Sequence, residues 1–358
     1  MFIKILKTTM QLFSATNFEE SFGSKKSSLF TIQNSNGMTA QITNYGATLV
    51  SLWVKNALGK ENDVVLGYER LSDYRKMTNP YFGRTIGRYG NRISNSQFTI
   101  DNKVFKLEKN DGHHNLHAGS DAFHAVIWDL VAHTTNTLTL SYLSPHLEGG
   151  FPGNLTVSVI FKITEDNALD ISYKAMTDAT THVNLTHHSY FNLNLDKTEP
   201  IDNHLLQIHG RSYLPIDKEC IPTDHIEAVS NTPFDFRNFK KIGQDINATH
   251  LQVALAGGYD HNFILDGEEM RVVAEVSSPS SGITMTVTTD EPGLQFYSGN
   301  HISSTPVGKY NETYIDRGGF CLETQHFPDS PNRADFPSSI LEAGSVYSSK
   351  CIYAFGIV

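Results

Sequence analysis

Apolar and polar side chains alternate with a period of two along much of this chain. The clearest case is the segment 155–163, in which every second residue is apolar: Leu155, Val157, Val159, Phe161 and Ile163. The segments 138–142, 169–175 and 283–288 repeat the pattern. Because successive side chains of a strand point to opposite faces, the alternation predicts strands with one face on a core and the other toward solvent or a cleft.

Helical patterns are few and short, and the best candidates are 69–76 and 238–246. Turn clusters such as 144–146, 165–167 and 279–282 separate the predicted strands. Many strands with little helix favour a sandwich or barrel over a doubly wound fold. We therefore predict an all-β protein: one large antiparallel β-sandwich domain over residues 18–358, preceded by an N-terminal extension over residues 1–17.

Composition narrows the range of partners. The chain has 358 residues and a net charge of −10, from 28 Lys and Arg against 38 Asp and Glu. This balance argues against nucleic acid or an anionic membrane as a partner, because both attract clustered cations, and it fits a neutral small molecule. The three cysteines, Cys220, Cys321 and Cys351, form neither a disulfide framework nor a metal knuckle. Without an apolar run long enough to span a membrane, we expect a cytoplasmic protein.

The glycine-rich segment 83–93 is the first stretch that does not look like a strand. Its glycine spacing matches neither the dinucleotide fingerprint nor the P-loop, and no helix pattern follows it. We interpret it as a turn in which Arg84 and Arg88 are solvated. Arg92 lies beside Asn91 and ahead of an apolar residue, so it is a better candidate for a buried donor to sugar hydroxyls.

Histidines mark two further stretches. The segment 110–119 contains His113, His114 and His117, which suggest a metal site but lack the regular spacing that directs ligands to one ion; residue types alone favour surface histidines. In 184–193, His187 and His188 are neighbours, so on a strand at most one of them enters a given cleft. Sequence physics alone favours a structural role for both.

Two carboxylates lie beside polar or glycine-rich segments, Asp260 within 257–262 and Glu323 within 319–326. Considered separately, Asp260 fits a turn residue and Glu323 a solvated charge.

Six motifs nevertheless occur in a set order: Gly87-Arg88-x-x-Asn91-Arg92-Ile93, Asn115-Leu116-His117, Asn184-Leu185-Thr186-x-His188-Ser189-Tyr190-Phe191-Asn192-Leu193, Gly258-Tyr259-Asp260-His261, Glu291-Pro292-Gly293-x-Gln295-Phe296-Tyr297-Ser298-Gly299-Asn300 and Cys321-Leu322-Glu323-Thr324-Gln325. Together they resemble the aldose 1-epimerase (galactose mutarotase) family, over roughly residues 18–358. One departure is His187, at a position where the family usually has Asn, and it puts a supporting hydrogen bond in doubt.

The resemblance implies a large twisted β-supersandwich with its site in an open cleft. It also implies that Glu323 is the general base and His188 the general acid, with His117 assisting. Substrate hydroxyls would be held by Asn91, Arg92 and Asp260, with Gln295 near the cleft. Exchange of configuration at C1 requires proton removal from the C1 hydroxyl and proton delivery to the ring oxygen, so one base and one acid suffice. We therefore expect no cofactor and no metal, a monosaccharide as partner, and a monomer or homodimer.

Three alternatives stay open at this point. A hexose-6-phosphate 1-epimerase would need added cations, for which Arg84 and Arg88 are candidates. A non-catalytic carbohydrate-binding protein would need the hydroxyl binders but not a paired acid and base. A metal-dependent, cupin-like sugar isomerase would use His113, His114 and His117.

Overall fold

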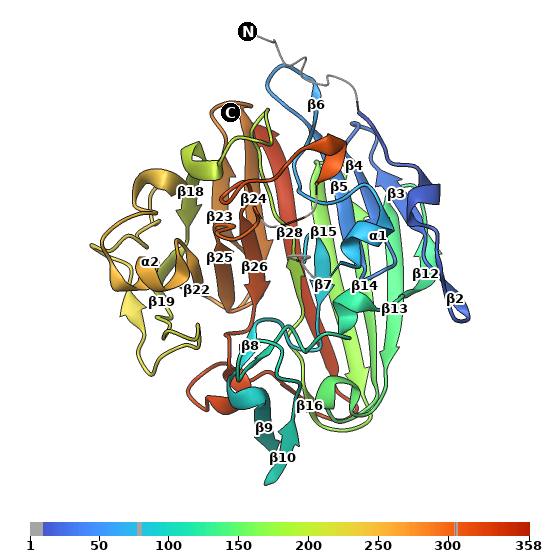
Figure 1. Ribbon diagram of the computed structural model, residues 1–358, viewed down its shortest axis with the longest axis vertical. Coiled ribbons are helices and arrows are strands. Elements are labelled where there is room, and N and C mark those ends of the chain that lie inside the picture. Colours follow the sequence, from blue (N-terminus) through green and yellow to red (C-terminus); the bar gives the residue numbers. More distant parts are fainter. Residues whose placement is uncertain (1–9, 77–80, 304, 306) are drawn as a thin grey trace.

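The computed structural model describes residues 10–76, 81–303, 305 and 307–358, and strands dominate it (Figure 1). A nine-stranded sheet forms one layer, and each of its neighbouring strand pairs is antiparallel. In spatial order its strands are β12 (Asp129–His133), β13 (Thr137–Ser144), β14 (Leu155–Ile163), β15 (Ala168–Thr177), β28 (Val346–Ile357), β24 (Ile283–Thr289), β23 (Arg271–Ser277), β18 (Leu205–Ile208) and β21 (Lys240–Lys241).

A second layer is assembled from three pieces that follow one another in space. The first is a four-stranded sheet of β3 (Leu29–Gln33), β4 (Thr39–Thr43), β5 (Thr48–Lys55) and β6 (Glu61–Asp63). The middle piece pairs β7 (Arg84–Ile86) with β17 (Thr186–His188), and β17 lies next to β26. The third is a five-stranded sheet of β20 (Glu227–Ala228), β19 (Gly210–Tyr213), β22 (Asp260–Leu265), β25 (Gly293–Tyr297) and β26 (Cys321–Gln325).

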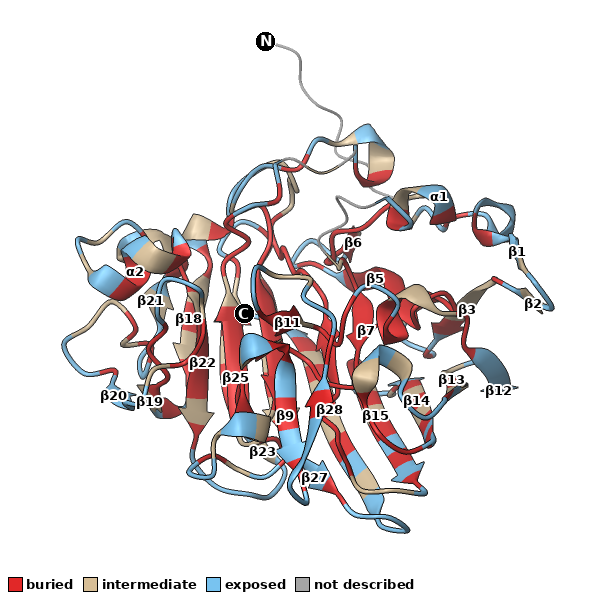
Figure 2. Ribbon diagram, turned by 60° about the horizontal axis from the view of Figure 1, so that its bottom comes forward, coloured by how far each residue is buried: buried red, intermediate tan, exposed pale blue. Residues whose placement is uncertain are grey.

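The hydrophobic core lies between these layers, as the red interior of Figure 2 shows. On β14 the predicted alternation is confirmed, because Leu155, Val157 and Phe161 are fully buried while Thr156 and Lys162 are exposed. The second layer adds its own inward residues to the same cluster: Leu49, Leu185, Phe263, Leu294, Phe296 and Leu322. One core shared by two antiparallel layers confirms the prediction of an all-β sandwich.

Four two-stranded ribbons complete the described strands. β8 (Arg92–Ile93) pairs with β11 (Asn115–Leu116), and this ribbon forms one wall of the candidate active site. The others are β1 (Ser21–Phe22) with β2 (Lys25–Lys26), β9 (Gln97–Ile100) with β10 (Lys103–Lys106), and β16 (Thr181–His182) with β27 (Ile340–Leu341).

The helix predictions were partly wrong. The segment 69–76 contains only the short helix α1 (Leu71–Tyr74). The segment 238–246 is not an α-helix but β21 followed by a 3-10 turn over Ile242–Gln244, because the backbone of β21 pairs with the edge of β18. An unpredicted helix, α2 (Leu251–Ala256), begins where His250 accepts a hydrogen bond from the Gln252 amide and ends at Gly257, whose φ is 66°.

Part of the predicted extension over residues 1–17 is described, whereas residues 1–9 lie outside the described ranges. Phe13 is buried, its amide donates to the Gln41 side chain at 2.8 Å, and the Gln41 amide donates back to its carbonyl at 3.0 Å. The division of the chain at residue 18 stays a prediction. Within the described ranges, every helix is too short or too polar to cross a membrane.

Candidate active site

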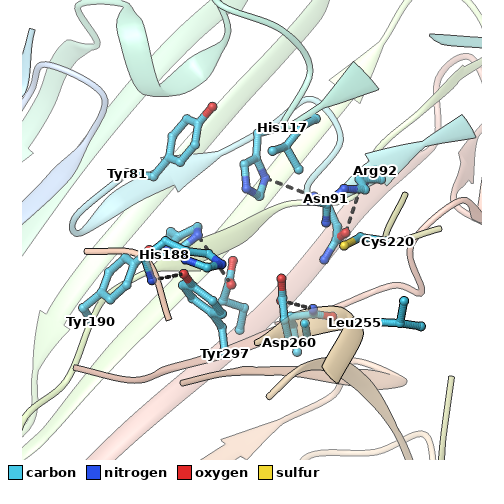
Figure 3. A pocket seen from close by; sticks show the side chains of 15 residues that line it. Tyr81, Asn91, Arg92, His117, His188, Tyr190, Cys220, Leu255, Asp260 and Tyr297 are labelled. Atoms are coloured by element: carbon cyan, nitrogen blue, oxygen red, sulfur yellow. Dashed lines mark hydrogen bonds and ion pairs between the residues drawn. The ribbon is translucent and has the colours of Figure 1, made fainter. Parts of the chain in front are cut away.

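A cavity of about 300 Å³ opens on the second layer, and four strands contribute to its floor (Figure 3). His188 is the last residue of β17, Glu323 lies in the middle of β26, Gln295 in β25, and Asp260 begins β22. In the antiparallel register Gln295 lies directly opposite Glu323. Because cross-strand partners share a face of the sheet, these side chains project together into the cavity.

One wall of the cavity comes from the β8–β11 ribbon, in which Arg92 pairs with Leu116. Asn91 and His117 flank this pair, with φ angles of 67° and 55°. The Asn91 amide donates to the ring nitrogen Nδ1 of His117 at 3.1 Å, and the His117 amide donates to the Asn91 carbonyl at 3.1 Å. The two residues therefore hold each other against the cavity in left-handed backbone conformations that are costly unless they are supported.

His188 and Glu323 form a close pair on the cavity floor. Nε2 of His188 is 3.7 Å from Oε1 of Glu323, and the two side chains are only 7% and 4% exposed. The other carboxyl oxygen of Glu323 has no hydrogen-bond partner among the described residues. The imidazole of His188 is stacked with Tyr190 and with Tyr81, at ring separations of 5.0 Å and 5.8 Å, which restrict its rotation.

Burial shifts the proton affinities of this pair in opposite directions. Desolvation, with a contribution from nearby Asp260, raises the pKa of Glu323 well above its ordinary value. Burial lowers the pKa of His188 to about 4. An isolated imidazole binds a proton more tightly than an isolated carboxyl group, and these two shifts oppose that order. In the protein alone, a proton bound by the pair therefore favours Glu323 more than it would in isolated side chains.

Asp260 and Arg92 face each other across the cavity, and Gln295 donates to Asp260 through Nε2 at 2.7 Å. Burial raises the pKa of Asp260, against opposing effects of Arg92 and of the Gln295 hydrogen bond. For Arg92, burial alone would lower the pKa, but Asp260 and Asp111 outweigh it and the pKa is raised. The guanidinium therefore stays charged beside an acceptor-only carboxylate, an arrangement suited to neighbouring hydroxyl groups.

The structure brings every predicted site residue to this cavity: Asn91, Arg92, His117, His188, Asp260, Gln295 and Glu323. As expected for adjacent strand residues, His187 points away, with its ring against Phe161 and its Nδ1 2.9 Å from the Ser189 hydroxyl. The separate interpretation of Glu323 as a solvated charge is wrong, because packing between β25 and β17 buries it.

The predicted solvation of Arg84 and Arg88 is also wrong. Arg84 is buried and donates to the carbonyls of His124 and Tyr74. Arg88 is buried too, and donates through Nε to Ser144 at 2.8 Å and through its terminal nitrogens to nearby loop carbonyls. Carbonyl acceptors take up the terminal nitrogens of both guanidinium groups, which explains how they are buried without a direct carboxylate contact, although Nε of Arg84 has no hydrogen-bond partner among the described residues.

The histidine cluster 113–117 is divided between different environments. His113 is exposed, whereas the expectation of a surface position is wrong for His114 and His117, which are buried. Nδ1 of His114 accepts from the Asn95 amide at 3.1 Å, away from the pair formed by His117 and Asn91. Because the three rings do not converge on one point, this cluster does not fit a cupin-like metal centre.

Another group of potential metal ligands lies at the cavity floor. Among the residues that the structure describes, His188, Cys321 and Glu323 have donor atoms within 4.8 Å of one another. The Cys321 sulfur is 3.5 Å from Nδ1 of His188, whereas Glu323 faces Nε2. The imidazole is thus contacted through opposite nitrogens, which fits a histidine held in line with its partners better than three ligands around one ion.

Several cavity residues were missed by the sequence analysis as individual candidates. Tyr81, Tyr190 and Tyr297 surround the acid–base pair, and the last two lie within the quoted motifs without a signal for their position. Cys220 reaches the cavity from a turn, at φ 61°. α2 brings Leu255 and Ala256 to the rim. These residues have no shared spacing that could have identified them.

Comparisons with known proteins agree with this geometry. Residues 28–354 match the family model described as "Aldose 1-epimerase". The chain is 39% identical over 324 residues to galactose mutarotase of Bos taurus, covering 90% of this chain and 92% of that protein. It is 37% identical over 331 residues to aldose 1-epimerase of Escherichia coli strain K12, covering 91% and 94%.

Solved structures give the same picture. The crystal structure of galactose 1-epimerase from Lactobacillus acidophilus superposes with a TM-score of 0.83 at 28% identity, covering 94% of this chain and 97% of that one. An aldose epimerase homologue from C. elegans superposes with a TM-score of 0.85 at 28% identity, covering 93% and 99%.

Proposed function

Because this chain belongs to the aldose 1-epimerase family, we propose that it interconverts the α and β anomers of free aldohexoses, such as galactose and glucose, by opening and reclosing the sugar ring. The observation that carries this proposal is the buried pair of His188 and Glu323, 3.7 Å apart on the floor of a polar cavity. Such a pair supplies the one base and one acid that the reaction requires.

The proposed cycle moves two protons and breaks one bond. The Glu323 carboxylate removes the proton of the C1 hydroxyl while protonated His188 delivers a proton through Nε2 to the ring oxygen. The bond between C1 and the ring oxygen breaks, and C1 becomes the aldehyde carbon. After rotation about C1–C2, the ring oxygen attacks the other face of the aldehyde, and both protons return to their starting groups.

A single proton held by the pair is sufficient for this cycle. It starts on His188, with Glu323 ionised, and it resides on Glu323 while the sugar is open. The raised pKa of Glu323 and the lowered pKa of His188 favour movement of the proton from His188 to Glu323 as the ring opens, because these shifts oppose the order of proton affinity in isolated side chains. Neither group is consumed, and the proposed chemistry uses no cofactor.

The remaining cavity residues are proposed to orient the sugar. Arg92 and Asn91 offer donors from the wall, and Asp260 and Gln295 offer acceptors from the floor. His117, whose pKa is lowered well below its ordinary value by burial, is neutral and able to hydrogen-bond near the reacting centre. Tyr81, Tyr190 and Tyr297 supply aromatic surface for the apolar face of the sugar.

The alternative of a phosphorylated substrate is disfavoured by the positions of the arginines. Arg84 and Arg88, the cations available for that role, bind backbone carbonyls and are not among the cavity residues. The non-catalytic alternative is disfavoured by the pKa shifts of the acid–base pair, because a binding protein gains nothing from burying a carboxyl group without a hydrogen bond. Free thiols at Cys220, Cys321 and Cys351 support the proposed cytoplasmic location.

Polarimetry of freshly dissolved α-D-galactose and α-D-glucose tests the proposed function. Purified protein should accelerate equilibration of both sugars without additives, and exhaustive chelation should leave the rate unchanged. A matched control is Glu275→Gln, since Glu275 lies 3.6 Å from His209 in an exposed pair. Inactivation by chelation with rescue by a divalent metal, or equal rates with and without protein, would contradict the proposal.

A further inference from the structure

Asp111 contacts the guanidinium group of Arg92. Arg92 lines the cavity, whereas Asp111 does not. Its Oδ2 accepts a hydrogen bond from Nε of Arg92 at 2.7 Å, with the two side chains 37% and 16% exposed. A tight turn sets this position: the Asp111 amide donates to the His114 carbonyl at 3.2 Å, and the His114 amide donates back at 2.9 Å. Between them Gly112 adopts a φ of 61°.

This contact leaves part of Arg92 available. Its terminal guanidinium nitrogens make no hydrogen bond to any residue in the described ranges, and the side chain lines the cavity. Arg92 is the one basic side chain, lysine or arginine, among the described residues that line the cavity. Asp260 and Glu323 are the acidic ones. Two carboxyl groups, Asp260 and Asp111, act on this guanidinium, and Glu323 adds a third carboxyl group to the same cavity.

We propose that Asp111 determines substrate specificity: by pairing with Arg92, it reserves the cavity for uncharged sugars and excludes sugar phosphates. The inference rests on the proposed function and adds to it the residue that selects against charge. Asp111 acts through Arg92 and is not itself placed against the substrate.

The physical basis is competition for one guanidinium. Arginine binds phosphate strongly because two parallel N–H groups along one edge match two phosphate oxygens. Asp111 accepts the hydrogen bond of Arg92 Nε, so the guanidinium edge that contains Nε is not available to a phosphate group. Its negative charge also offsets that of the guanidinium at a contact distance, where Coulomb interactions between partly buried groups are substantial. Neutral hydroxyls still bind the terminal nitrogens, because such hydrogen bonds do not depend on a net positive field.

Asp111→Asn tests the inference, because the amide keeps an oxygen that can accept from Arg92 Nε but loses the charge. Galactose 6-phosphate is used as a competitive inhibitor of galactose mutarotation. We expect its inhibition constant to fall roughly three- to tenfold, the scale of removing one partly screened charge at contact distance. The KM for galactose should change by less than about twofold. High salt should reduce the gain.

Two variants act as controls. Asp129→Asn removes a carboxylate that pairs with Lys25 at 2.8 Å, outside the cavity, and should leave both constants unchanged. Asp111→Glu restores the charge and should restore wild-type discrimination.

In an Arg92→Gln background, Asp111→Asn should produce no further gain in phosphate binding, because the cation that it exposes is absent.

A binding measurement separates this inference from the proposed function. Calorimetric titration with galactose and with galactose 6-phosphate reports discrimination even if the wild-type protein proves inactive in polarimetry. If Asp111→Asn weakens both ligands equally, or leaves their ratio unchanged, Asp111 merely supports Arg92 and the inference is overturned.

Discussion

Two regions of this protein each place a histidine next to a buried glutamate, with opposite consequences. On the cavity floor, Nε2 of His188 is 3.7 Å from Glu323. His326 directly follows strand β26, which contains Glu323, and its Nδ1 is 2.7 Å from Oε2 of Glu291, a direct hydrogen bond. Both glutamates are almost fully buried.

The surroundings of the two carboxyl groups differ as much as the distances. Glu291 also accepts from the Tyr347 hydroxyl at 3.2 Å, and the pair with His326 outweighs burial, so the pKa of Glu291 is lowered. Burial would lower the pKa of His326, but Glu291 raises it overall. In the cavity, by contrast, burial dominates: the pKa of Glu323 is raised and that of His188 is lowered.

A difference of 1 Å thus separates a structural ion pair from a pair suited to proton transfer. At hydrogen-bond distance the two charges stabilise each other and the proton stays on the histidine. Across the wider gap, desolvation is not compensated, so burial disfavours the charged form of each group. The same gap leaves both groups accessible to the cavity, where a substrate can complete the contacts that the protein leaves unmade.

The largest effect is expected from the cavity pair. Glu323→Gln and His188→Asn should each lower kcat about 10²–10⁴-fold, the usual contribution of a positioned proton-transfer group. The double variant should lose less than the product of the two, since groups that act as a unit are not additive. Stopped-flow polarimetry gives kcat, and protection from thermal unfolding by galactose checks that the sugar still binds. A folded, sugar-binding Glu323→Gln enzyme with near wild-type kcat would require another base, with Asp260 examined first.

Glu291→Gln should lower the stability of the protein and leave kcat almost unchanged, in contrast to Glu323→Gln. The glutamine amide keeps one accepting oxygen but loses the charge and the second acceptor, so one of His326 and Tyr347 loses its partner. We expect the free energy of unfolding to fall by about 2–4 kcal/mol, because the remaining groups are desolvated without compensation. Chemical denaturation measures this loss. Activity per folded molecule should stay within about threefold of wild type, and a loss of kcat as large as that of Glu323→Gln would erase the contrast between the two regions.

Asp260→Asn should affect both binding and the acid–base pair. Loss of a charged acceptor should raise KM for galactose roughly five- to tenfold. Asp260 also contributes to the raised pKa of Glu323, so its neutralisation should lower that pKa. The alkaline limb of the kcat/KM profile, where the pair loses its single proton, should then move to lower pH. Unchanged KM together with an unchanged profile would place Asp260 outside the working site.

The smallest effect is a difference in how the two glutamates link stability to pH. Glu323 has a raised pKa in the folded state, so its contribution to stability falls as pH rises above the ordinary 4.5. Glu291 has a lowered pKa, so its contribution is present above 4.5 and is lost as pH falls through the folded pKa. Relative to wild type, Glu323→Gln should gain roughly 1–3 °C in Tm between pH 5 and pH 8, whereas the Tm deficit of Glu291→Gln should shrink below pH 4.5. Parallel pH dependences in calorimetry would contradict the assigned directions.

Much of the fold and of the candidate site was predictable because strand periodicity and short motifs are local signals. Alternation in segments such as 155–163 identified strands, and the motif resemblance identified every polar residue that is assigned a role in the cavity. The segment 238–246 was predicted incorrectly because the edge of β18 pairs with Lys240 and Lys241. Arg84 and Arg88 were misjudged because their acceptors are carbonyls of loops distant in sequence.

The sequence by itself determined the strand-rich architecture, the candidate polar residues that the structure brings to the cavity, and the placement of His187 and His188 on opposite faces. Tertiary structure decided which groups are desolvated and how far apart they stand, because these quantities depend on the packing of β17 against β26 and of β25 between its neighbours. Residue type and strand periodicity do not show that Glu323 and Glu291 differ in how their burial is compensated. Only the folded arrangement places one 3.7 Å from its histidine in an open cavity and the other at 2.7 Å in a closed hydrogen-bonded pair, and solvation energy is steep over that difference.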